Sequence, residues 1–202
     1  MTLRLYNSYM VRTWQMLLEL LWPHDEVLAV KRSGAGTSNY KSTRYLFSYK
    51  EPDVQTLIKR TKYQADRVAA KQLATYLDTY VAQLQHNYII IPMPISYQRW
   101  RARGYNHIEL ICKNSEYANR VRTDILKKSQ HTKQQTQVSK TERTKQQLGT
   151  FSCRATRCHT LPQTVILLDD VVTTGATMAA ARATLQLHMP PRTELICLAI
   201  AH

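Results

Sequence analysis

The sequence contains few residues that could build a metal centre. Its four cysteines include no Cys-x-x-Cys pair, and none of them precedes Cys112. Such spacing indicates neither a zinc knuckle nor a disulfide framework. Cys153, Cys158 and His159 lie close enough along the chain to ligate a metal, but scattered reduced thiols are the simpler interpretation. We therefore expect no zinc site and a reducing, cytoplasmic environment.

Long hydrophobic runs are also missing. The N-terminal apolar stretch within residues 10–22 is interrupted by Gln15 and Glu19. It is too short to span a bilayer and lacks the small-residue cleavage site of a signal peptide. An amphipathic helix that packs on the rest of the chain is the better interpretation, so we expect no membrane span.

Acidic residues are scarce, with 14 Asp and Glu against 28 Lys and Arg, and the formal net charge is +14. Residues 99–160 carry fourteen Lys or Arg and four acidic residues, so most of the excess positive charge lies in this segment. A basic segment favours polyanions such as pyrophosphate, nucleotides or nucleic acid. A solvated basic surface without a specific partner would have the same composition, so both interpretations stay open.

Residues 165–177 are the most informative segment, and they read VILLDDVVTTGAT. A continuous apolar run predicts a parallel strand that is buried on both faces, with Asp169 and Asp170 at its carboxyl end. The hydroxyl-rich turn that follows offers backbone N–H groups and a helix N-terminus to a phosphate. This turn consists of Thr173, Thr174, Gly175, Ala176 and Thr177. Carboxylates for sugar hydroxyls beside a phosphate-binding turn predict a phosphorylated sugar as ligand.

Apolar runs predict four strands, in residues 45–49, 88–93, 165–168 and 194–201. Helical spacing predicts helices in residues 53–83, 104–121 and 178–187, and the polar residues 128–148 predict a mobile loop. Strands that alternate with helices are typical of an α/β protein with a mostly parallel sheet flanked by helices. We expect this domain to occupy residues 45–202, after a small N-terminal appendage, residues 1–44, that starts as a helix.

The segment 165–177 resembles the thirteen-residue signature of the type I phosphoribosyltransferases, which bind 5-phosphoribosyl pyrophosphate (PRPP). The resemblance implies the type I phosphoribosyltransferase fold. It also implies that Asp169 and Asp170 bind the ribose hydroxyls, directly or through a Mg²⁺ cofactor near both carboxylates. The turn from Thr173 to Thr177 would then bind the 5′-phosphate.

Further segments resemble the ComF/GntX family, whose competence-associated members act in DNA uptake and transformation. Residues 91–95 read IPMPI and residues 99–107 read RWRARGYNH, which is similar to the family's Pro-x-Pro strand end and its Arg-Gly-Phe-Asn-Gln stretch. Residues 45–50 and 58–66 resemble its aromatic strand and its Lys-Phe/Tyr-x-Gly-Asp turn. Residues 132–136 and 143–151 resemble its flexible loop. The matches follow the family's order along the chain.

Phosphoribosyl transfer requires cationic groups that stabilise the departing pyrophosphate. Arg103 is the first candidate for this contact, followed by Lys62 and Arg99, because arginine donors bind phosphate oxygens in pairs. By the resemblance, a flexible loop would close over the site and exclude water. Its candidate residues are Lys133, Gln134, Thr136 and Arg143. No residue stands out as a catalytic base, and the acceptor cannot be read from the sequence.

The sequence departs from the family pattern in three places. Family members commonly begin with a four-cysteine zinc module, which this chain lacks. His107 replaces the usual Gln, and Ala65 replaces the usual Gly before Asp66.

Two hypotheses follow from the resemblance. The first is a pentosyl-transferring enzyme of natural competence that moves phosphoribosyl from PRPP to an unknown acceptor. The second is a non-catalytic, DNA-associated PRPP-binding module. Under either hypothesis, single-stranded DNA and a helicase-like competence protein are expected partners.

Overall fold

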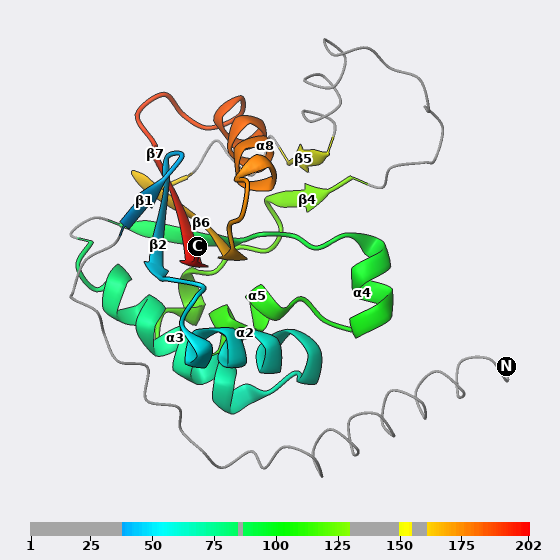
Figure 1. The fold of residues 1–202 in the computed structure, drawn as a ribbon. Helices are drawn as coiled ribbons and strands as arrows, with labels where there is room; N and C mark the ends of the chain where they lie inside the picture. The colour runs from blue at the N-terminus through cyan, green and yellow to red at the C-terminus, as the bar shows by residue number, and fades with distance from the viewer. Residues whose placement is uncertain (1–37, 85–86, 130–149, 155–160) are drawn as a thin grey trace, which may run out of the picture.

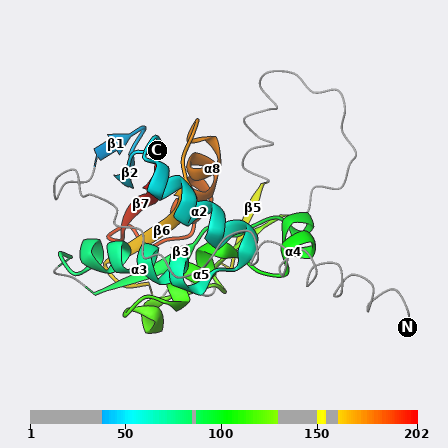
Figure 2. The same cartoon turned by 60° about the horizontal axis from the view of Figure 1, so that its bottom comes forward.

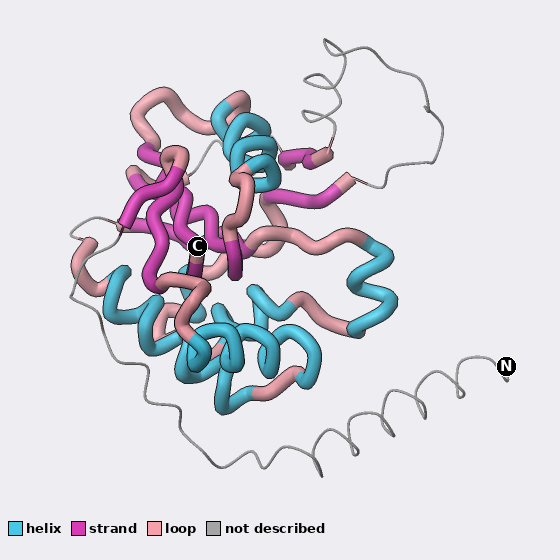
Figure 3. The backbone as a smooth tube through the Cα atoms, in the orientation of Figure 1, coloured by secondary structure: helices cyan, strands magenta, loops and turns pink. Residues whose placement is uncertain are grey.

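The computed structural model describes residues 38–84, 87–129, 150–154 and 161–202, and these residues form an α/β protein (Figure 1). A central sheet lies between two layers. Helices α2 (Pro52–Gln64), α3 (Arg67–Val81) and α5 (His107–Lys113) pack on one face, and helix α8 (Ala176–Gln186) with a small two-stranded sheet packs on the other. Figure 3 shows the strands in magenta between the two groups of helices.

The central sheet has five strands in the order β1-β2-β7-β6-β3. Strands β2, β7, β6 and β3 run parallel to their neighbours, and β1 pairs with β2 in the antiparallel direction. In chain order the strands are β1 (Ser38–Tyr40), β2 (Thr43–Phe47), β3 (Tyr88–Pro92), β6 (Thr164–Val171) and β7 (Glu194–Ala201). The sheet is mixed because its edge strand β1 is antiparallel. The sequence did not predict this edge strand.

The helical layer next to the site consists of α2 (Pro52–Gln64), α3 (Arg67–Val81) and α5 (His107–Lys113). Figure 2, turned from the first view, shows these three helices lying over the sheet. The remaining elements are α4 (Tyr97–Arg103), the 3₁₀ helix η1 (Ala118–Arg120), β4 (Leu126–Lys128), β5 (Phe151–Cys153) and α8 (Ala176–Gln186). None of the described helices combines the length and the apolar character needed to cross a membrane.

Strand β6 has apolar side chains on both faces, as its unbroken hydrophobic run predicts. Ile166 and Leu168 enter the core beneath α2, α3 and α5, whereas Val165 and Leu167 enter the core beneath α8. All four side chains are 0% exposed. Side chains of a strand alternate between its faces, so this central strand anchors both cores and holds its carboxyl end in place.

The turn between α2 and α3 is closed by Asp66. Its carboxylate accepts hydrogen bonds from the backbone N–H groups of Val68 and Ala69, and so caps the first turn of α3. The same carboxylate pairs with the buried guanidinium of Arg60 at 2.6 Å. Ala65, between the two helices, adopts the left-handed conformation with φ 54°. This turn fixes the last turn of α2, which carries Lys62.

The predicted helix over residues 104–121 is wrong in extent. Gly104 ends α4 with φ 79°, and α5 runs only from His107 to Lys113. Beyond α5, Asp78 of α3 accepts hydrogen bonds from the Ser115 hydroxyl and the Glu116 backbone N–H. These contacts tie the segment to α3, and the chain makes a turn there in place of further helix.

The other predicted elements are found with small shifts of their ends. The strand expected over 45–49 is Thr43–Phe47, and the strand expected over 194–201 has those bounds. Residues 1–37 of the predicted appendage lie outside the described residues, as do residues 130–148 of the loop predicted over 128–148.

Candidate functional site

Asp169 and Asp170 lie near the carboxyl end of β6, where the sequence predicts a ligand site. Their carboxylates are held by the local backbone. Asp169 Oδ1 accepts a hydrogen bond from the Asp170 N–H at 2.9 Å, and Asp170 Oδ1 accepts one from the Val171 N–H at 2.8 Å. The Asp170 residue is buried, with 7% exposure, and Asp169 is partly exposed. Taken as a whole residue, Asp169 is therefore more exposed than Asp170.

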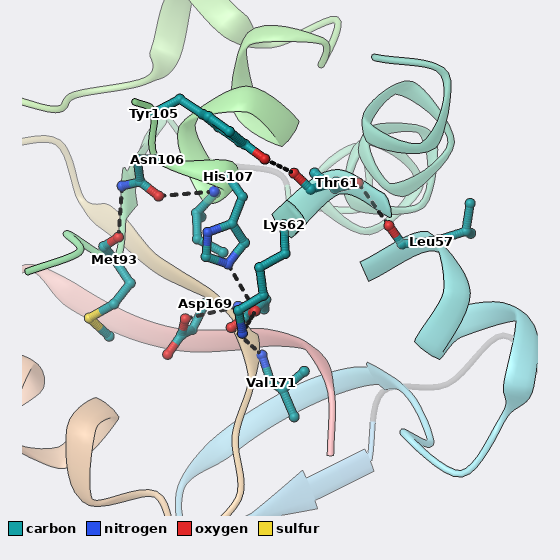
Figure 4. Close-up of polar contacts among 11 residues, drawn as sticks. Leu57, Thr61, Lys62, Met93, Tyr105, Asn106, His107, Asp169 and Val171 are labelled. Atoms are coloured by element: carbon teal, nitrogen blue, oxygen red, sulfur yellow. Dashed lines mark hydrogen bonds and ion pairs between the residues drawn. The ribbon is translucent and has the colours of Figure 1, made fainter. Parts of the chain in front are cut away.

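Asp170 receives two further donors from the helical layer. Lys62 Nζ of α2 lies 3.0 Å from Asp170 Oδ2, and His107 Nε2 of α5 lies 2.9 Å from the same oxygen. Figure 4 shows the Lys62 and His107 side chains converging on the end of β6. The His107 side chain is 5% exposed, and its Nδ1 is buried with no hydrogen-bond partner among the described residues. Lys62 Nζ and His107 Nε2 thus meet at one carboxylate oxygen.

The adjacent carboxylates have opposite pKa shifts. Burial raises the pKa of Asp169, and the negative charge of Asp170 raises it further. Burial also opposes ionisation of Asp170, but hydrogen bonds and charges from His107 and Lys62 outweigh it, so the pKa of Asp170 is lowered. Asp170 is therefore the ionised partner of the two. A ligand that brings positive charge or donors to Asp169 would favour its ionisation as well.

The positions of Lys62 and His107 depend on their sequence neighbours. The Tyr105 hydroxyl donates to the Thr61 carbonyl at 2.9 Å and accepts from the Ala65 N–H at 2.9 Å. Asn106 caps α5 by accepting from the Ile108 N–H, and its amide donates to the Met93 carbonyl just after β3. Figure 4 shows the contact of Tyr105 with Thr61 and that of Asn106 with Met93. Tyr105 thus ties α5 to the end of α2, and Asn106 ties it to the end of β3.

The predicted phosphate-binding turn follows β6 directly. Gly175 has φ 78° and precedes the first residue of α8, so glycine suits this position. Thr173, Thr174 and Thr177 are exposed. The first N–H groups of a helix have no partners within the helix, and the helix dipole adds positive potential there. The turn therefore presents hydroxyl and N–H donors to solvent near the two carboxylates.

The structure brings together only some of the predicted cations. Lys62 contacts Asp170 directly. Arg103 lies with its guanidinium 5.1 Å from the centre of the Tyr63 ring, and its Nη1 is buried without a hydrogen-bond partner among the described residues. Arg99 is exposed on α4. The predicted flexible-loop residues lie outside the described residues, namely Lys133, Gln134, Thr136 and Arg143.

Three basic residues at this site were not selected from the sequence. His107 was noted only as a departure from a family pattern, although its place in the Arg-Gly-Tyr-Asn-His run was the available signal. Lys128, at the end of β4, has a pKa lowered by burial and by Arg99, while the carboxylate of Asp169 opposes that shift. Lys41 donates to the Thr174 carbonyl at 3.2 Å. No local pattern indicates the positions of Lys41 or Lys128.

The described residues include no group of three or more His, Cys, Asp or Glu that could hold a metal ion by themselves. Asp169 and Asp170 nevertheless have the oxygen donors that suit Mg²⁺, which commonly binds one or two carboxylates and completes its shell with water and substrate phosphate. Two adjacent carboxylates near the end of β6 fit that mode.

No family model matches the chain. The chain is 26% identical to the competence protein ComFC of Streptococcus pneumoniae over 158 residues, which cover 77% of this chain and 64% of ComFC. It is 33% identical to competence protein F of Haemophilus influenzae over 141 residues, covering 64% of this chain and 60% of that protein. The matches thus span less than two thirds of either relative's length. The chain is thus similar to two competence proteins, and the similarity to ComFC agrees with the resemblance that its sequence motifs carry.

Proposed function

We propose that the chain binds PRPP at the carboxyl end of β6 and transfers its phosphoribosyl group to an acceptor that is still to be identified. The observation that carries this proposal is the juxtaposition of Asp169 and Asp170 with the open turn at the start of α8. Carboxylates suit vicinal hydroxyls, and a helix N-terminus suits a phosphate. A ribose 5-phosphate has both groups.

Asp169 and Asp170 would accept hydrogen bonds from the ribose 2′ and 3′ hydroxyls. Lys62 and His107 hold Asp170 ionised, so this carboxylate is ready to accept such bonds. The Asp169 and Asp170 oxygens would also hold Mg²⁺, which supplies positive charge for the departing pyrophosphate. The turn from Thr173 to Thr177 would bind the 5′-phosphate through its hydroxyl and N–H donors.

In the transfer, the bond between ribose C1 and the pyrophosphate oxygen breaks, and the electron pair leaves with pyrophosphate. A nucleophilic atom of the acceptor forms the new bond to C1. Lys62 and Arg103 are the cations offered for the leaving group, since Lys62 lies at the carboxylates and Arg103 has a donor without a partner among the described residues. Such preorganised donors stabilise charge that develops during reaction.

The similarity to two competence proteins supports a role of this chain in competence. We propose that ligand binding at β6 serves that process. The matches span less than two thirds of either relative, so the activity of the relatives does not carry over to this chain. PRPP binding and phosphoribosyl transfer therefore have to be measured on this chain itself.

Calorimetry with PRPP and Mg²⁺ tests the site. Wild-type protein should bind PRPP, and Asp169→Asn combined with Asp170→Asn should abolish binding. Glu194→Gln is the matched control, because Glu194 is an exposed acid at the opposite end of the parallel strands. Unchanged PRPP affinity in the double variant would disprove the assigned site. Release of pyrophosphate from PRPP in the presence of acceptor pools then separates transfer from binding alone.

A second function, binding of single-stranded DNA, is favoured by the exposed side of α4. Tyr97 and Trp100 are each 51% exposed, and their rings stack with centroids 6.4 Å apart and an interplanar angle of 15°. The Arg101 guanidinium lies 6.0 Å from the centre of the Tyr97 ring. The helix contains three arginines and no acidic residue. Exposed aromatic rings with nearby cations suit stacked bases and a phosphate backbone.

Fluorescence anisotropy with a labelled single-stranded oligonucleotide tests this second function. Tyr97→Ala combined with Trp100→Ala should weaken binding by about tenfold or more, because stacking contributes roughly 1–3 kcal/mol per base. The affinity of the wild-type protein should fall steeply with salt. Leu187→Ala removes a 74% exposed apolar side chain just after α8 and serves as control. A flat salt response would rule out binding through the DNA backbone.

A further inference from the structure

We propose that Lys41, in the hairpin between β1 and β2, binds the 5′-phosphate of the sugar ligand at the start of α8. The inference rests on the proposed function, because it adds a cation to the same phosphate-binding turn. It concerns a residue that is 133 positions from the turn in sequence and next to it in space.

The hairpin has an unusual turn for its residue types. Tyr40 pairs with Thr43, so only Lys41 and Ser42 form the loop. Both have positive φ, 44° and 64°, as in a type I′ turn. Such turns favour Asn and Gly, and left-handed backbone is unfavourable for other residues. Backbone of this kind persists only where its surroundings hold it, and it is frequent at ligand sites.

The surroundings of the hairpin connect it to the phosphate turn. The Tyr40 ring stacks on the His202 ring with centroids 3.9 Å apart and an interplanar angle of 20°. His202 Nδ1 lies 2.7 Å from the Val172 carbonyl oxygen, to which it donates when that nitrogen is protonated. Val172 directly precedes the turn. The hairpin is therefore held against the backbone from which the turn begins.

The Lys41 side chain extends over the turn. Its Cδ lies 3.8 Å from the position that a Cβ on Gly175 would occupy, so its aliphatic part lies beside Gly175. Its ammonium donates to the Thr174 carbonyl at 3.2 Å. An ammonium has three donors, and this contact uses one. The remaining donors are on an exposed residue at the edge of a turn that already presents N–H groups and a helix N-terminus.

Charge makes this position suitable for a phosphate. The helix dipole of α8 gives its N-terminus positive potential, and the Lys41 ammonium adds a full positive charge beside it. An exposed lysine also retains its hydration, so its effect on binding should be moderate and sensitive to salt.

Lys71 of α3 offers a matched comparison. It is also exposed, and its ammonium donates to a backbone carbonyl, that of Asn114, at 3.1 Å. Lys71 thus makes the same kind of hydrogen bond as Lys41. Its partner Asn114, however, belongs neither to the phosphate-binding turn nor to the end of β6. A difference between the two variants therefore reports the location of Lys41 rather than the loss of any exposed lysine.

Calorimetry with three probes tests the inference: PRPP, ribose 5-phosphate and pyrophosphate, each with Mg²⁺. Lys41→Met should weaken PRPP and ribose 5-phosphate about tenfold, equivalent to about 1.4 kcal/mol. Pyrophosphate affinity should stay unchanged, because pyrophosphate lacks the 5′-phosphate. Lys41→Arg should retain most of the affinity, and Lys71→Met should bind all three probes as wild type does. Equal melting temperatures of all variants would show that each one folds.

The outcomes separate this inference from the proposed function. If wild type binds PRPP and Lys41→Met binds ribose 5-phosphate equally well, Lys41 is not a phosphate ligand and the proposed function stands. If Lys41→Met weakens pyrophosphate by the same factor as ribose 5-phosphate, the contact to the 5′-phosphate is refuted. If wild type binds neither PRPP nor ribose 5-phosphate, the proposed function and this inference both fail.

Discussion

Asp66 closes the turn between α2 and α3, and this turn holds the end of α2 that carries Lys62. We expect replacement of Asp66 to destabilise the protein by a measurable amount. Asp66 caps α3 and pairs with Arg60, and the two side chains are only 3% and 4% exposed. Asp66→Asn keeps a good capping residue but removes the negative charge. Asp66→Ala removes both the cap and the charge. Comparison of the two variants therefore separates capping from ion pairing.

The expected losses follow from the burial of the pair. Removing one partner of a buried ion pair costs about 3–5 kcal/mol. Because Arg60 has further interactions, we expect Asp66→Asn to lower the free energy of unfolding by about 3 kcal/mol, the lower end of that range. Asp66→Ala should lose about 1 kcal/mol more, the usual value of an N-cap.

Urea denaturation followed by circular dichroism measures these free energies. Arg60→Met combined with Asp66→Asn should recover much of the loss, because a buried pair replaced as a unit leaves no uncompensated charge. A small loss in Asp66→Asn, under about 1 kcal/mol, would show that the pair does not stabilise the turn. Equal losses in the Asn and Ala variants would refute the capping argument.

Acid should reveal the same pair. Burial raises the pKa of Asp66, but N–H donors from Ala69 and Val68 and the Arg60 guanidinium outweigh it, so the folded-state pKa is lowered. Because the pKa of Asp66 is lower in the folded state, its ionised carboxylate stabilises the fold at any pH above the unfolded-state pKa of 3.8. This stabilisation is lost as the pH falls from there through the pKa of the folded state. Wild type should therefore lose stability below about pH 4 more steeply than Asp66→Asn. Parallel pH profiles would contradict this assignment.

Three further predictions concern single residues. Ala65→Gly should raise the free energy of unfolding by about 0.5–1 kcal/mol, because relief of about 1–2 kcal/mol of left-handed strain exceeds the added chain entropy. As a control, Ala179→Gly at an exposed position of α8 should lower the free energy of unfolding by about 1 kcal/mol. If urea denaturation showed that both glycine variants are less stable than wild type, the strain argument would be refuted. Tyr105→Phe should cost about 1–2 kcal/mol in the same assay, since the Ala65 N–H and Thr61 carbonyl lose a shared partner; no loss would show that water replaces it. Burial raises the pKa of Cys112 to about 12 and that of Cys197 to about 11, so thiol reagents at pH 8 should label both only after unfolding; rapid labelling of the native protein would show that these thiols are open to solvent.

Local patterns in the sequence predicted the central strands well. The apolar run of β6 indicated a strand buried on both faces, and β7 begins and ends where its apolar pattern does. Both predictions succeed because side-chain alternation and burial act along a single segment. The predicted carboxylates at the end of β6 follow from the same local order.

Other elements could not be predicted from local patterns. The sequence predicts a helix that starts at Gly104, whereas Gly104 ends α4, which begins after the capping residue Ser96. Ser96 and Gly104 are typical residues at the two ends of a helix. A helix of seven residues, however, is too short to show a clear helical periodicity in the sequence. The β1–β2 hairpin has no Asn-Gly or Gly signal, because Lys41 and Ser42 occupy its left-handed positions.

The order of residues along the chain predicts which segment could hold a phosphorylated sugar, because Asp169, Asp170 and the turn after them are adjacent. Which basic residues lie beside that segment follows from the fold. Lys62 and His107 are 108 and 63 residues away from Asp170, and Lys41 is 133 residues away from Thr174. The strand order β1-β2-β7-β6-β3 and the packing of α2 and α5 bring these residues to one edge of the sheet. The spacing of residues along a chain carries no information on such distances, so only the folded structure places these basic residues.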